Sequence, residues 1–363
     1  MKLALATTAL SLVLGTQALA VERSEVIDTY VDIAAAKYAD SLSTARTLQD
    51  KVAALIADPS EAALEEARKA WKAARVPYQQ TEVYRFGNAI VDDWEGKVNA
   101  WPLDEGLIDY VDASYGGGEE NGFAALNVVA NPTFILSGSE IDATEITPEL
   151  LSETLHEADG VEANVATGYH AIEFLLWGQD LNGHAPGAGD RPWTDYATGA
   201  DCTNGNCDRR GDYLRAATEL LVSDLEYMAA QWAEGGAARA EVTADETAGL
   251  SAILTGMGSL SYGEQAGERM RLGLMLNDPA TATTTTALES SRRTSAATRG
   301  PTAPPSPAPP CRIWCRKRTP RSMRNCATSS RPRWPPLVTS RTQRTTALPT
   351  TRCWSAATNA AKR

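Results

Sequence analysis

A histidine and a glutamate stand three positions apart in an otherwise apolar stretch, "GYHAIEFLLWGQD" at residues 168–180. His170 is one of only three histidines in 363 residues, and Glu173 follows it. On a helix, positions i and i+3 share a face, so the imidazole and the carboxylate can point at one object, such as a metal ion. Gly168 lets a second backbone or a ligand come close. The alternative is a buried core histidine whose hydrogen-bond partner is Glu173.

Two further charged groups lie in helical, apolar sequence. Glu82 and Arg85 are three apart in "RVPYQQTEVYRFGNA", and Glu264 and Glu268 are four apart, beside Arg269, in "GSLSYGEQAGERMR". Each group can be solvated surface charge, yet charges within apolar helices need partners. We therefore expect these groups and the histidine pair to surround one shared site. Three glycines in the second stretch predict tight helix contact: Gly258, Gly263 and Gly267.

The donor set limits the chemistry of such a site. One imidazole with two carboxylates is rich in oxygen and suits iron, manganese or calcium better than a structural zinc site. A zinc peptidase needs about three protein ligands and an open position for water. Its usual helical motif, H-E-x-x-H, does not occur, and the other histidines are His156 and His184. Zinc is an alternative that this donor set does not exclude.

Apolar side chains recur at steps of three and four, which indicates amphipathic helices. No convincing strand pattern is present, so we expect an all-α fold of packed bundles. Asp58 should cap the second helix with Pro59 in its first turn, and Pro77 should stop or kink it. Thr243 and Glu246 form a capping-box pattern before the last helix. The helices are expected at 24–57, 59–76, shortly after Pro77, and at 161–177, 212–232 and about 243–276, with a loop at 178–210.

That long loop contains two cysteines, Cys202 and Cys207, which enclose "TNGN". In an exported protein such a pair predicts a disulfide. Two thiols without a second pair or a nearby histidine make a weak metal site, which is the alternative. The other four cysteines lie beyond residue 280.

The first twenty residues are typical of a secretory signal peptide, with Lys2, an apolar stretch and small residues before a cleavage site after Ala20. No later segment has the roughly 18 uninterrupted apolar residues of a spanning helix. We therefore expect an exported protein without a membrane span, periplasmic in a Gram-negative bacterium or secreted.

Charge is distributed unevenly along the chain. The net charge is -12, but residues 280–363 hold 16 Lys and Arg against the single acid Glu289, which leaves -27 for residues 1–279. A nucleic-acid-binding protein presents a basic face, so the acidic body argues against that class of partner.

The basic, Pro-, Thr- and Arg-rich segment 280–363 is predicted to be out of frame and unstructured. When the last base of each codon is joined to the first two bases of the next, "RKRTPRSMRNC" at 316–326 permits the reading EADAALDAELR, an acidic helical pattern like those upstream. The alternative is a genuine disordered tail. The predicted organisation is a signal peptide at 1–20, a helical domain at 21–279 and this tail.

The stretch at 168–180 matches the G-x-H-x-x-E signature of imelysin-like proteins, so the sequence resembles that family. The likeness extends, in the family's order, over "AWKAARVPYQQTEVYRFGNA" (70–89), "WPLDEGLIDYV" (101–111), "CTNGNCDRRGDYL" (202–214) and "GSLSYGEQAGERMR" (258–271). It ends after "LMLNDP" (274–279), where further helices and an acidic segment with Cys and His would be expected.

The resemblance implies an all-helical fold of two packed bundles with a site between them, in an exported protein linked to iron acquisition. It implies metal ligands at Glu82, His170 and Glu173, with Arg85, Glu264 and Arg269 as surrounding binding residues. Iron is the expected ion, with zinc, calcium or copper as alternatives. Other periplasmic or outer-membrane iron-uptake proteins are the expected partners.

Two other classes of function stay open at this point. An exported metallopeptidase would use the same cluster to activate water, with Glu264 or Glu268 as general base. A binding or adaptor module would recognise an organic ligand or a protein in the same cleft without a metal.

Overall fold

The computed structural model of the protein describes residues 21–113, 115, 121–182 and 187–271. The predicted signal peptide, His184 and the predicted out-of-frame tail lie outside these residues. The described residues belong to one compact unit of the chain. None of the helices among them is both long enough and apolar enough to cross a membrane.

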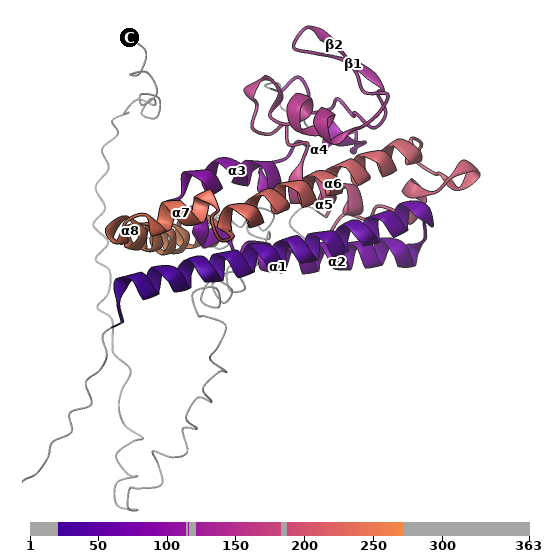
Figure 1. Cartoon of the computed structure of the whole chain (residues 1–363). Helices are drawn as coiled ribbons and strands as arrows, with labels where there is room; N and C mark the ends of the chain where they lie inside the picture. The colour runs from indigo at the N-terminus through magenta and orange to yellow at the C-terminus, as the bar shows by residue number, and fades with distance from the viewer. Residues whose placement is uncertain (1–20, 114, 116–120, 183–186, 272–363) are drawn as a thin grey trace, which may run out of the picture. The chain divides into compact units, whose positions relative to one another are not determined.

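The described part is helical, which confirms the predicted fold class (Figure 1). The α-helices are α1 (Arg23–Ala57), α2 (Glu61–Gln79), α3 (Ala89–Asn99), α4 (Glu105–Ile108), α5 (Gly168–Trp177), α6 (Cys207–Trp232), α7 (Ala237–Thr243) and α8 (Glu246–Gly258). Short 3-10 helices are η1 (Glu82–Tyr84), η3 (Ala158–Gly160), η4 (Trp193–Tyr196) and η5 (Gly199–Asp201). Two π-helices are η2 (Leu150–Leu155) and η6 (Ser259–Arg269), and η6 continues directly from α8.

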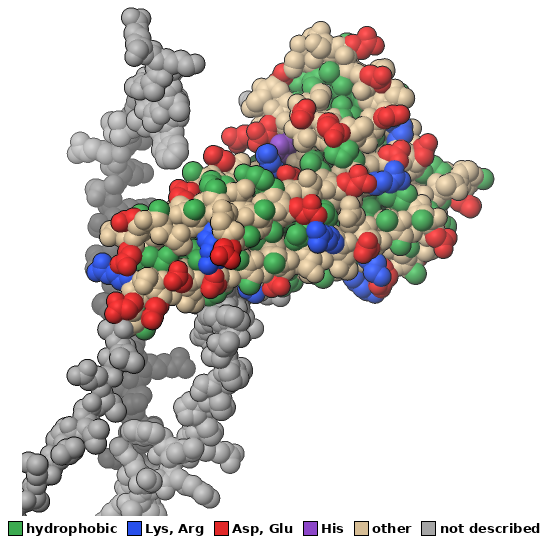
Figure 2. Space-filling view, in the orientation of Figure 1, with side chains coloured by type: hydrophobic (Ala, Val, Ile, Leu, Met, Phe, Trp, Pro, Cys, Tyr) green, Lys and Arg blue, Asp and Glu red, His purple; other side chains and the backbone are tan. Residues whose placement is uncertain are grey.

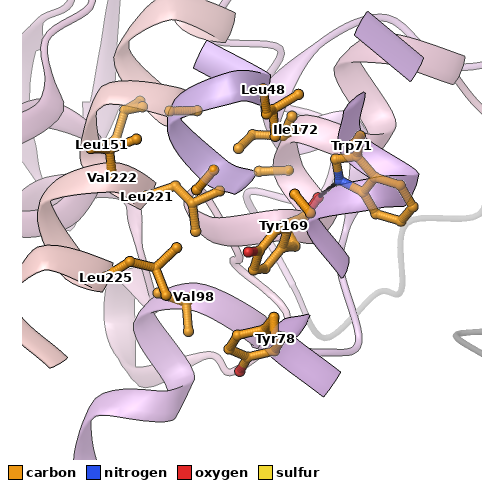
Figure 3. Packing of buried hydrophobic residues seen from close by; sticks show 14 of the residues in the cluster. Leu48, Trp71, Tyr78, Val98, Leu151, Tyr169, Ile172, Leu221, Val222 and Leu225 are labelled. Atoms are coloured by element: carbon orange, nitrogen blue, oxygen red, sulfur yellow. Dashed lines mark hydrogen bonds between the residues drawn. The ribbon is translucent and has the colours of Figure 1, made fainter. Parts of the chain in front are cut away.

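The long helix α1 packs along both α2 and α6, and α5 packs against α2 and α6. The apolar stripe predicted for residues 24–57 is the buried face of α1, on which Val31, Tyr38 and Leu48 are almost inaccessible to solvent. Most buried hydrophobic residues of the described part form one continuous cluster. Figure 3 shows side chains of several helices meeting there, and the indole of Trp71 donates a hydrogen bond of 2.9 Å to the carbonyl oxygen of Tyr169. The predicted division into two bundles also concerns residues beyond 271 and stays a prediction.

The prediction that the chain contains no strands is wrong. Strands β1 (Thr133–Leu136) and β2 (Ser139–Asp142) form an antiparallel hairpin. Its two-residue turn is Ser137-Gly138, and both residues have positive φ, +52° and +80°. A Ser-Gly dipeptide after a run of β-branched and aromatic residues is a hairpin signal, but the strands are too short for alternation to reveal them.

Several helix boundaries also differ from the predicted ones. The second helix is capped by Ser60, whose side chain accepts a hydrogen bond from the backbone N–H of Ala63, instead of by Asp58. Pro77 lies inside the last turn of α2, two residues before its end at Gln79, so it does not stop the helix there. The helix expected at 161–177 begins only at Gly168, and α6 begins at Cys207, five residues before the predicted start.

The capping box predicted before the last helix does not form. Thr243 ends a separate helix, α7, that was not predicted, and the N-cap of α8 is Asp245, whose carboxylate accepts from the N–H of Ala248. Asp and Thr are both good N-cap residues, so the sequence does not choose between Thr243 and Asp245. The end of α7 at Thr243 makes Asp245 the cap.

The predicted disulfide between Cys202 and Cys207 is present, with 6.1 Å between the two Cα atoms. It closes a tight loop immediately before the first turn of α6. The loop thereby stays beside the N-terminus of that helix.

Candidate functional site

A cleft of about 610 Å³ is bordered by α2, η1, α3, α5 and η6. Its lining is strongly charged and carries more acid than base. The acidic lining residues are Glu82, Asp92, Glu95, Glu157, Glu162, Glu264 and Glu268; the basic ones are Arg75, Arg85 and Arg269. His170 also lines it. An acidic cleft attracts cations. Acidic side chains are also spread over the described surface in Figure 2.

His170 is held in the wall of this cleft by α5. Its side chain is buried, and Nδ1 lies 2.9 Å from Oε2 of Glu173. The ring of Trp101 lies against the imidazole, with 5.1 Å between ring centroids. Burial lowers the pKa of His170, and its contact with Glu173 opposes that shift without reversing it. The imidazole is therefore neutral at pH 7, which is the form that binds metal ions.

The start of α5 is fixed by a close backbone approach. Gly168 has φ of +77°, and a Cβ atom added there would lie 2.4 Å from the carbonyl oxygen of Val98. Only glycine fits this position without displacing the end of α3. The predicted role of Gly168 in close contact is confirmed, and this contact sets the position of His170, two residues later.

Glu82 lines the same cleft from a different part of the chain, the 3-10 turn η1. Both of its carboxylate oxygens accept from the guanidinium of Arg269 in η6; the Nη1–Oε2 distance is 3.2 Å, and Nη2 contacts Oε1. Nη2 of Arg269 is also 3.7 Å from Oε2 of Glu264. The structure thus brings together Glu82, Glu264 and Arg269, three of the residues that the sequence analysis singled out. Glu268 lines the same cleft.

Arg85 makes different contacts from those expected. Its guanidinium pairs with Asp92 at 2.9 Å and with Glu95 at 3.6 Å, both from α3, while Glu82 pairs with Arg269. The i+3 spacing of Glu82 and Arg85 does not lead to a pair between them, because each finds its partner on another element: α3 for Arg85 and η6 for Glu82.

Several cleft residues were missed by the sequence analysis, among them Glu95, Asn99 and Arg75. Glu95 accepts from Nδ2 of Asn99 at 2.8 Å, and Oδ1 of Asn99 accepts from Nη1 of Arg75 at 2.6 Å. Burial raises the pKa of Glu95, and Arg85 opposes this. The i+4 spacing of Glu95 and Asn99 was a possible signal, but a partner from α2 cannot be read from it.

The predicted metal ligands can be compared with this geometry. His170 and Glu82 line the same cleft, whereas Glu173 is not among its lining residues and lies on the Nδ1 side of the imidazole. Within the described ranges, no three His, Cys, Asp or Glu side chains are close enough together to hold a metal ion. The donors have the chemistry of an iron site, but Glu82 is turned to Arg269 and would have to rearrange to bind an ion.

A second cluster, whose charged side chains are buried, was also missed. Oδ2 of Asp109 accepts from Arg191 at 2.7 Å and from Arg210 at 2.6 Å. Oδ2 of Asp195 accepts from Arg191 at 2.9 Å and from the hydroxyl of Tyr110 at 2.7 Å. The cluster joins the ends of α4, η4 and α6. Its charged side chains tolerate burial because each is paired with a side chain of opposite charge.

The family model for imelysin, a peptidase family by its label, matches residues 34–300, most of the chain. The chain belongs to the imelysin family. The match ends within the segment that we predict to be out of frame.

Curated and solved relatives are more distant. Iron-regulated protein A of Synechococcus elongatus is 34% identical over 79 residues, which are 22% of this chain and 20% of that protein. A solved structure from Parabacteroides distasonis, assigned as an iron-regulated protein A precursor, has 21% identity and a TM-score of 0.47, with 74% of this chain and 64% of that one covered. An imelysin-like protein from Psychrobacter arcticum has 19% identity and a TM-score of 0.48, with 77% and 74% covered.

Proposed function

We propose that the protein binds a metal ion, iron before zinc, calcium or copper, in the acidic cleft and takes part in bacterial iron acquisition. The family and the name of its curated relative, iron-regulated protein A, support the link to iron. The excess of carboxylates in the cleft supports the choice of a cation as ligand.

The observation that carries this proposal is the state of His170. It is a neutral, buried imidazole on the wall of an acidic cleft, and its Nδ1 is already engaged by Glu173. Nε2 is therefore the ring nitrogen available for an ion. Histidines that bind metals commonly present one nitrogen to the ion and the other to a carboxylate.

Within this proposal the three predicted residues have different roles. His170 supplies the nitrogen donor and Glu82 a carboxylate donor from the same cleft. Glu173 holds the imidazole in orientation from Nδ1, and Arg85 balances the neighbouring carboxylates. An iron ion bound there would be held as cargo, without a reaction.

We further propose that the protein is exported to the periplasm or secreted after cleavage behind Ala20. The apolar N-terminal stretch and the disulfide between Cys202 and Cys207 support an oxidising compartment. Its partners there would be other proteins of iron uptake.

The test is an anaerobic calorimetric titration of the purified full chain with Fe²⁺. We expect saturable binding that is lost in His170→Ala. His156→Ala is the matched control, because His156 is also largely buried but does not line the cleft. Circular dichroism and thermal unfolding of both variants check that they fold. Binding that is unchanged in His170→Ala would overturn the assignment.

A metallopeptidase is the second candidate. Glu264 and Glu268, the two alternatives predicted for the general base, both line the cleft with His170, and this placement favours the candidate. Its test is cleavage of an unfolded peptide by protease-free protein. Cleavage that chelators abolish, and that is lost in Glu264→Gln or Glu268→Gln while metal binding persists, would support it; no cleavage in the presence of added metal would exclude it.

A further inference from the structure

Arg269 and Glu82 form a bidentate ion pair in the cleft. Two guanidinium nitrogens face two carboxylate oxygens, and the side chains are only 20% and 18% exposed. A bidentate, partly buried pair of this kind is stronger than an exposed one. Both carboxylate oxygens with which Glu82 would bind a cation already accept from the guanidinium.

The backbone holds these two residues together across 187 positions of sequence. A Cβ atom added to Gly256 of α8 would lie 2.3 Å from the carbonyl oxygen of Val83 in η1. On the other side of η1, a Cβ atom added to Gly87, whose φ is +87°, would lie 3.2 Å from Cα of Ala252. These two glycines let α8 pack directly on the turn that carries Glu82. The π-helix η6 then continues from α8 and places Arg269 over the carboxylate.

A second acceptor stands beside the pair. Oε2 of Glu264 is 3.7 Å from Nη2 of Arg269, on the same π-helix. If the guanidinium leaves Glu82, it can move to Glu264 by a side-chain rotation, without unfolding η6. The freed Glu82 would then be a carboxylate open to a cation in the cleft that His170 also lines.

We infer that Arg269 competes with the cation for the carboxylate of Glu82. It pairs with Glu82 when no ion is bound, and an entering ion must displace it toward Glu264. This inference rests on the proposed function of the cleft and adds the residue that sets its affinity. A multivalent cation competes for a carboxylate better than a single guanidinium charge, so the pair also disfavours monovalent ions. Removing the charge of Arg269 should therefore tighten binding instead of weakening it.

The experiment titrates the full chain with Mn²⁺, which is stable in air, and with Fe²⁺ under anaerobic conditions, by calorimetry. Arg269→Gln removes the positive charge, and Arg269→Lys keeps the charge but loses the two-pronged contact. Arg271→Gln is the matched control, because Arg271 lies on the same segment, is exposed and does not line the cleft. Glu82→Gln, alone and combined with Arg269→Gln, tests whether the effect passes through that carboxylate. Circular dichroism checks the fold of each variant.

We expect Arg269→Gln to lower the Kd by about tenfold or more, the scale of one uncompensated charge at a partly buried site. Arg271→Gln should change it by less than about twofold, since exposed charges are screened. The double variant should bind no better than Glu82→Gln. If the wild type binds and Arg269→Gln binds equally or more weakly, the inference is wrong while the proposed function stands. If only Arg269→Gln binds, Arg269 does compete for the carboxylate, but the proposed function and the displacement of Arg269 by an ion in the wild type are wrong. If neither binds, both are overturned.

Discussion

Oε2 of Glu173 lies 2.9 Å from Nδ1 of His170, one helical turn along α5, and Glu173 is not among the residues that line the cleft of His170. The i+3 spacing predicted that the two side chains share a helix face. The shared face gives a hydrogen bond between them, so in the proposed site the carboxylate would act on a bound ion through the histidine.

This relationship predicts the effect of removing Glu173. Glu173→Ala should weaken Fe²⁺ binding by about 10–100-fold, as loss of a partner behind a metal-binding histidine does, while His170→Ala abolishes it. Calorimetric titration measures both. Glu153→Ala, at an exposed position, serves as control. Complete loss of binding in Glu173→Ala would show that Glu173 binds the ion directly.

The backbone contact at the start of α5 predicts an unequal cost of two Gly→Ala changes. Gly168→Ala should destabilise the fold by about 3 kcal/mol or more, because left-handed strain adds to a clash with the carbonyl of Val98. Gly160→Ala has a similar φ of +71° but open space around the added Cβ, so it should cost only about 1–2 kcal/mol. Urea unfolding of both variants measures the difference. Equal losses would mean that the close approach does not matter.

Glu105 predicts a dependence of stability on pH. Burial raises its pKa to about 7 from an ordinary 4.5; Asp180 and Glu173 add to the shift, and Arg191 opposes it. The folded state thus holds a proton that the unfolded state has lost between these two values, so the contribution of Glu105 to stability falls as pH rises through that window.

Glu105→Gln removes this penalty. It should stabilise the fold by up to about 3 kcal/mol at pH 8 and by less than about 1 kcal/mol at pH 5. Urea unfolding at the two pH values, with the exposed Glu140→Gln as control, gives the comparison. A gain that is the same at both pH values would contradict the raised pKa.

The buried ionic cluster predicts a large effect far from the cleft. Asp109→Asn leaves the guanidiniums of Arg191 and Arg210 without their shared counter-charge and should cost about 3–5 kcal/mol. Asp212→Asn breaks only a half-exposed pair with Arg215 and should cost less than about 1 kcal/mol. Chemical unfolding measures both losses. A mild effect of Asp109→Asn would show that the buried charges are compensated in another way.

The composition of residues 280–363 predicts a change of reading frame shortly after Pro279. Resequencing of the gene should find one missing or extra base near that codon, followed by an acidic, helical continuation. An uninterrupted frame across it would leave the basic tail as the true product.

The sequence was sufficient for the features that depend on local pattern. Steps of three and four between apolar residues fixed the buried face of α1, because a helix repeats every 3.6 residues whatever it packs against. The pair Cys202 and Cys207 and the contact between His170 and Glu173 were also local. The hairpin at Ser137-Gly138 was missed because its strands are only four residues long.

The pairing of charges was decided only by the tertiary structure. Arg85 pairs with Glu95, and Glu82 pairs with Arg269, although Glu82 and Arg85 are only three positions apart in the sequence. The cluster around Asp109 likewise joins residues more than 80 positions apart. Periodicity tells which face of a helix is apolar, but an ion pair depends on which helix ends lie next to each other. Close backbone contacts at glycines, such as that of Gly256 with Val83, determine which ends are neighbours.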